Sequence, residues 1–172
     1  MQKKSVARLV VAAMCLALCL VLPFLTGQIR EIGSMLCPMH LPVLLCGFLC
    51  GWPWGLAVGA VAALLRSALF GMPPLFPIAV SMAAELAVYG LVTGLLSARL
   101  PKKLGWTYVS LIAAMLLGRV AWGLVRLLLA GLSGGAFTWA MFLSGALTTA
   151  IPGIIVQLIL VPVIVTAVQK RV

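Results

Sequence analysis

Two arginines interrupt an otherwise apolar stretch of the sequence, "LLGRVAWGLVRLLL" at residues 116–129. On a helix, Arg119, Trp122 and Arg126 are spaced i, i+3 and i+7, so they share one face, with about 10 Å between the two arginines along the axis. Glu85 and Tyr89, four residues apart, also share a helical face. Cationic and aromatic side chains in this arrangement could bind a small organic ligand with one charged end.

The composition around these residues is that of a membrane protein. Of the 172 residues, 65% are hydrophobic and only 8% are charged, and the mean hydropathy is +1.27. A soluble domain usually has about a quarter of its residues charged, so we expect lipid to surround most of this chain. Because a spanning helix needs about 20 apolar residues, the length predicts one membrane domain over residues 1–172 with about five to seven spans.

Turn-forming sequences divide the chain into six apolar segments. Gly, Pro and charged residues cluster between them. The least certain boundary is at Pro53, because residues 41–65 contain no charge and could form one long span. The predicted segments are residues 7–27, 36–52, 54–71, 75–98, 105–131 and 139–168.

The distribution of basic residues favours six spans. If the turn at Pro53 is cytoplasmic, only Arg30 lies outside among the basic residues near helix ends, as the positive-inside tendency requires. We therefore predict an all-α integral membrane protein, a six-transmembrane-helix bundle with cytoplasmic N and C termini. The net charge of +10 then reflects topology and not nucleic-acid binding. The basic residues predicted to be inside are Lys3, Lys4, Arg8, Arg99, Lys102, Lys103, Lys170 and Arg171.

Small residues recur every four positions and predict close packing of helices. Lipid gives helices no hydrophobic reason to associate, so small residues that let backbones approach indicate a compact bundle. Ala13 and Ala17 form an isolated A-x-x-x-A pair on the first predicted helix, which could pack internally or contact a partner protein. The longer series are Gly47, Gly51, Gly55, Gly59, Ala63, Ser67 and Gly71, then Gly90, Gly94 and Ala98, then Gly145, Thr149 and Gly153.

Four charged residues fall inside the predicted spans: Arg66, Glu85, Arg119 and Arg126. Each costs about 2.5 to 3.5 kcal/mol at a helix centre on insertion scales, so we expect them to face the bundle interior. The six-span topology places all four near the midplane or in the outer half, which predicts a polar cavity open to the outside. In one interpretation Glu85 and Arg119 form a structural ion pair; in the other, the excess of positive charge binds an anion.

The order and spacing of several motifs resemble a known family. "MHLPVLLCGFLCGWPWGLAVGAVAALLRSALFGMP" is followed by "MAAELAVYGLVTGLL", "LLGRVAWGL" and "IPGIIVQLILVP", and this order is similar to that of the substrate-binding S component of an energy-coupling factor (ECF) vitamin transporter. The resemblance implies a multi-pass protein of a bacterial plasma membrane that captures a vitamin or related micronutrient. It implies as partners a transmembrane coupling subunit (T component) and two cytoplasmic ATPases, and it assigns Ala13 and Ala17 to the coupling-subunit interface.

The resemblance also suggests which residues bind the ligand. Family ligands are held by the first loop and the outer ends of the fourth to sixth helices. Glu85 and Arg119 lie in motifs that look general to the group, which favours a scaffold role for them, and Arg66 is a further candidate. The excess of positive charge favours a carboxylate or phosphate, with pantothenate as the first guess and a pyridoxine-type vitamin as the second. The candidates for specificity are His40, Tyr89, Trp122, Arg126 and Trp139.

Other functions have less support. The chain has no G-x-x-x-x-G-K-[ST] motif, so we expect a protein that is not an enzyme, needs no cofactor and relies on partner subunits for ATP hydrolysis. Cys37 and His40 have the spacing of half a metal site without a second half. An intramembrane protease using Ser133 would need a histidine at the same depth, and the lone His40 lies at another helix end. A membrane scaffold of the cell-shape machinery, with a similar six-helix fold, is the alternative.

Overall fold

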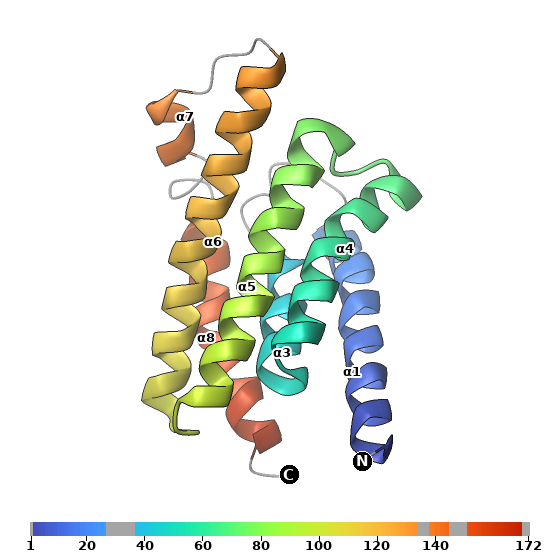
Figure 1. The fold of residues 1–172 in the computed structure, drawn as a ribbon, viewed down its shortest axis with the longest axis vertical. Helices are drawn as coiled ribbons and strands as arrows, with labels where there is room; N and C mark the ends of the chain where they lie inside the picture. Colours follow the sequence, from blue (N-terminus) through green and yellow to red (C-terminus); the bar gives the residue numbers. More distant parts are fainter. Residues whose placement is uncertain (1, 27–36, 134–137, 145–150, 170–172) are drawn as a thin grey trace.

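The computed structural model describes residues 2–26, 37–133, 138–144 and 151–169, and the regular elements in these ranges are all helical (Figure 1). Five of the helices are long and apolar enough to cross a membrane. The predicted all-α membrane bundle is therefore confirmed, whereas the count of six spans and the cytoplasmic termini stay predictions. The five are α1 (Gln2–Val21), α4 (Trp52–Phe70), α5 (Val80–Arg99), α6 (Leu104–Ser133) and α8 (Ile151–Gln169).

The second predicted span forms a short helix, α3 (His40–Cys50). Its 11 residues extend roughly 16 Å at 1.5 Å per residue, which is about half the hydrocarbon thickness of a bilayer. The helix ends at Gly51, whose φ of 94° is a conformation that favours glycine. Pro53 follows in the first turn of α4, where its missing N–H costs nothing. Residues 41–65 thus form two helices and not one long span.

Glycines bring the backbones of α3, α4 and α5 into direct contact. A Cβ atom added to Gly90 of α5 would overlap the carbonyl of Gly55 on α4, and one added to Gly59 would overlap the carbonyl of Leu86. Gly47 of α3 faces Gly90 in the same way. The predicted packing role of these small-residue series is confirmed at this interface, because no larger residue fits without moving the helices apart.

The remaining elements extend the bundle on both sides of α5. The π-helical turn η2 (Leu75–Ala79) leads from α4 into α5, and α6 packs along α5. The start of α1, the end of α8 and the turn between α5 and α6 lie at one end of the bundle, and the connection from α4 to α5 lies at the other (Figure 1). α1 is followed by the short 3-10 helix η1 (Leu22–Thr26) and packs against α3 and α4.

The last predicted segment, residues 139–168, contains two helical elements. α7 (Trp139–Leu143) has its own N-cap, since the side chain of Thr138 accepts a hydrogen bond from the backbone N–H of Met141 at 3.3 Å. The long helix α8 begins only at Ile151. Gly145 and Thr149 of the third small-residue series lie outside the described residues.

Candidate functional site

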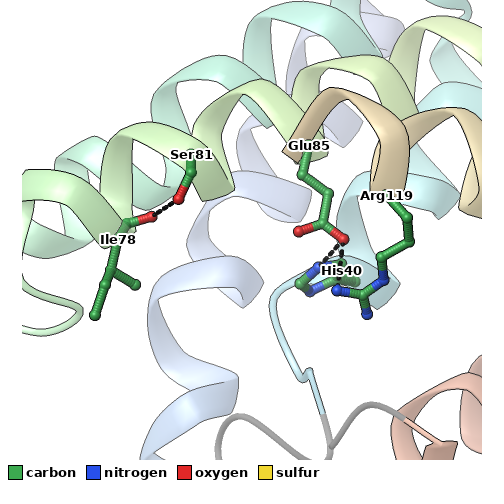
Figure 2. A network of polar contacts seen from close by, with 5 residues as sticks. All are labelled: His40, Ile78, Ser81, Glu85 and Arg119. Atoms are coloured by element: carbon green, nitrogen blue, oxygen red, sulfur yellow. Dashed lines mark hydrogen bonds and ion pairs between the residues drawn. The ribbon is translucent and has the colours of Figure 1, made fainter. Parts of the chain in front are cut away.

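Glu85 is the centre of a buried polar cluster between three helices (Figure 2). Its Oε1 lies 3.0 Å from Nη1 of Arg119 and 3.4 Å from Nε2 of His40. The exposed fraction is 1% for Glu85 and 3% for His40, so both side chains are removed from solvent and lipid. His40 opens α3, Glu85 lies in the second turn of α5, and Arg119 lies in the middle of α6. The expected pairing of Glu85 with Arg119 is present, and His40 joins it.

Tyr89 closes one side of this cluster. It follows Glu85 by one helical turn on α5, and its ring packs edge-on against His40 with the ring centroids 5.3 Å apart. Gly118 of α6 makes this possible, because a Cβ atom at that position would overlap the Tyr89 ring. The glycine before Arg119 therefore allows α6 to approach α5 closely enough for the arginine to reach Glu85.

Apart from the atoms that make the two contacts with Glu85, two buried nitrogen atoms of the cluster have no hydrogen-bond partner in the described part of the chain: Nδ1 of His40 and Nε of Arg119. Leaving a buried polar atom unsatisfied costs about 1 to 3 kcal/mol, and native proteins usually provide a partner from the chain, from water or from a ligand. Because Nε2 of His40 faces a carboxylate, a neutral ring would carry its proton on Nε2. Nδ1 is then a hydrogen-bond acceptor, whereas Nε of Arg119 is a donor.

Trp122 and Arg126 lie farther along α6. Cζ of Arg126 is 5.8 Å from the centroid of the Trp122 ring, a cation–π distance. The same ring lies 6.1 Å from that of Phe142 on α7, with 32° between the planes, and Gly123 leaves room for Phe142. The expected sharing of a face by Trp122 and Arg126 is confirmed. Trp139 is the first residue of α7, and its side chain lies outside the described residues.

Arg66 is held by a different part of the bundle. Its Nη1 donates a hydrogen bond to the carbonyl of Leu20, in the last turn of α1. Its Cζ lies 5.0 Å from the ring centroid of Phe24 and 5.3 Å from that of Phe70. In the structure Arg66 thus links the end of α4 to the end of α1, and the residues described in contact with it do not include Glu85. A ligand contact by Arg66 stays a prediction.

No group of three or more metal-binding side chains occurs among the residues that the structure describes. Within these residues, no further metal-binding side chains join Cys37 and His40 of the C-x-x-H sequence. The His40 side chain faces Glu85.

A family model for the substrate-specific component of ECF transporters matches residues 7–165. The chain belongs to this family. No curated protein and no solved structure matches the chain. The resemblance expected from the motifs is confirmed, and this S component is accordingly a membrane-embedded substrate-binding subunit of an ECF-type importer and not an enzyme. Its family associates with a T component and the ATPases of the ECF module, which favours transport over the alternative of a membrane scaffold.

Proposed function

We propose that this S component captures a small anionic micronutrient of the vitamin class from outside a bacterial cell, with the anionic group of the ligand directed toward Arg119 and Arg126. The charge balance supports an anion. Inside the predicted spans, three arginines (Arg66, Arg119 and Arg126) accompany one acidic residue, Glu85, which already faces Arg119. A carboxylate or phosphate would compensate the remaining positive charge where hydrogen bonds to ions are strongest, away from water.

The observation that carries the proposal is the pair of unsatisfied nitrogens, Nδ1 of His40 and Nε of Arg119. Both belong to side chains that contact the same oxygen of Glu85. A ligand that offers an oxygen acceptor to Arg119 and a nearby O–H or N–H donor to His40 would satisfy both atoms. Pantothenate has a carboxylate, hydroxyl groups and an amide N–H and is the first candidate; a pyridoxine-type vitamin is the second.

The location of the cluster supports capture from outside. Glu85 is the sixth residue of α5, whose opposite end carries Arg99. Arg99, Lys102 and Lys103 belong to the end of α5 and the turn before α6. This turn lies at the end of the bundle where α1 starts and α8 ends (Figure 1). The positive-inside tendency assigns this basic end to the cytoplasm, so Glu85 belongs to the outer half of a bundle with six spans and cytoplasmic termini.

Ligand binding by the purified protein tests the proposal. After removal of any co-purified ligand, we expect one anionic vitamin of a B-vitamin panel to raise the unfolding temperature, with a dissociation constant between about 1 nM and 1 μM. Arg126→Ala should weaken this binding about 10- to 100-fold, the effect of losing one hydrogen bond to a charged group. The unfolding temperature without ligand should change little, because the Arg126 side chain is only partly buried.

The matched control is Arg99→Ala, which removes the same charge from an exposed position at the other end of the bundle and should bind the vitamin normally. An equal loss of affinity in both variants, or no stabilisation by any vitamin, would contradict the proposal. Mass spectrometry of co-purified small molecules distinguishes pantothenate from a pyridoxine-type ligand.

A further inference from the structure

The turn between α5 and α6 borders an open hollow at the basic end of the bundle. Charged, hydroxyl and aromatic groups meet there, which is unusual for a chain with so few polar residues. The hollow is remote from the polar cluster, since its α5 residue, Ser97, lies 12 positions beyond Glu85 along the helix. Its lining includes Phe48, Ser97, Lys102, Trp106, Thr107 and Ser110.

One cation, Lys102, lines this hollow, and two more, Arg99 and Lys103, lie close to it in the sequence. Arg99 ends α5, Lys102 and Lys103 directly precede α6, and all three side chains are exposed. No acidic residue follows Glu85 in the sequence, so this turn has no acidic neighbour on α6 or α8. The positive charge of the turn is therefore available to an anion from outside the chain.

An apolar surface continues from the hollow along α6 toward the membrane core. Trp106 lines the hollow and is exposed, and Val109, Leu117 and Val120 follow it on the same helical face and are exposed as well. Aromatic side chains of this kind occur at the level of lipid headgroups. A charged turn, an aromatic ring and an apolar strip thus follow one another in the order of the headgroup, glycerol and acyl regions of a phospholipid.

We propose that this surface binds an anionic phospholipid of the cytoplasmic leaflet. Lys102 and Lys103 contact its phosphate, Trp106 lies beside its glycerol region, and the acyl chains follow the exposed strip of α6. The positive-inside tendency explains why basic residues lie at this end. It does not explain why Lys102 and Trp106 line a hollow that continues into an apolar strip on the face of Trp106. The proposal is independent of which vitamin the protein binds.

The test measures how the solubilised, full-length protein responds to lipid added to detergent micelles. Phosphatidylglycerol should raise the unfolding temperature more than phosphatidylcholine, and native mass spectrometry should show retained phosphatidylglycerol. The double variant Lys102→Gln/Lys103→Gln should need at least about tenfold more phosphatidylglycerol for half of the effect. Lys4→Gln/Arg8→Gln removes the same charge from α1 and should respond like the original protein.

A second variant and a soluble probe make the outcome decisive. Trp106→Leu retains every charge and should also weaken the response, since the aromatic contact at the glycerol level is lost. Equal losses in the two double variants would overturn the proposal in favour of diffuse charge attraction. Equal stabilisation by soluble glycerol phosphate at the same concentration would also overturn it, because the site would then bind a free phosphate and not a lipid.

Discussion

Small residues four positions apart occur in two regions of the molecule, the interface between α4 and α5 and the outer face of α1. They are buried against another helix in the first region and exposed in the second. At the first, Gly55 and Gly90 bring two backbones into contact. At the second, Ala13 and Ala17 are both exposed, and Met14 between them is 60% exposed. A helical face with this spacing is thus covered by another helix of the chain in one region and exposed in the other.

A partner for the open face of α1 stays a prediction from the family to which the chain belongs. S components associate with a T component, and α1 has its buried side toward α3 and α4 and its alanines pointing away from them. Glycine permits the closest approach of two backbones, whereas alanine keeps them a methyl group farther apart. We therefore interpret the glycine interface as permanent packing and the alanine face as the contact with the T component.

Breaking the glycine interface should have the largest effect on stability. Gly90→Ala places a methyl group where the carbonyl of Gly55 lies, so α4 and α5 must separate along their length. We expect the free energy of unfolding to fall by about 3 kcal/mol or more, at or above the upper range for overpacking. Titration with a denaturing detergent, followed by circular dichroism, measures this change.

Ala98→Val is the matched control for that substitution. Ala98 lies on the same helix in an exposed position, so added methyl groups should change stability by less than about 0.5 kcal/mol. If Gly90→Ala were as stable as Ala98→Val, the close contact of the two backbones would not exist in the membrane.

The next largest effect on stability should come from the contact between α4 and α1. Arg66→Met removes the donor to the Leu20 carbonyl and the cation between Phe24 and Phe70. We expect a loss of about 1 to 3 kcal/mol, because a partly buried carbonyl loses its partner. The same denaturation assay measures it, with Arg8→Met, an exposed position on α1, as the control. Unchanged stability combined with lost vitamin affinity would instead identify Arg66 as a ligand contact.

The glycine packing and the Glu85–Arg119 pair could be predicted from the sequence for physical reasons. Small residues four positions apart form a flat strip on any helix, and an acid in lipid must find a base. The site of Arg66 could not be predicted in this way. Its partner is a backbone carbonyl at Leu20, and every residue type has a carbonyl.

The role of His40 was only partly foreseen. Its position near the ligand was expected from the family resemblance, but its contact with Glu85 depends on where the short helix α3 starts relative to α5. Helical periodicity predicts which residues share a face but not how two helices are rotated and shifted against each other. The start of α8 at Ile151 was not predicted for a related reason, since apolar composition indicates a span without indicating where its helix starts.

The smallest effect on the isolated chain should come from the open face of α1. Ala13→Leu/Ala17→Leu adds bulk to exposed positions, so the free energy of unfolding should change by less than about 0.5 kcal/mol, and vitamin binding should be normal. Co-purification with the T component and ATPases should fall at least about tenfold, because the bulk prevents close helix approach.

Ala98→Leu/Ala167→Leu adds the same bulk at exposed positions of α5 and α8 and should assemble normally. Normal assembly of the α1 variant would assign the T-component contact to another face and leave the exposed alanines as lipid-facing residues.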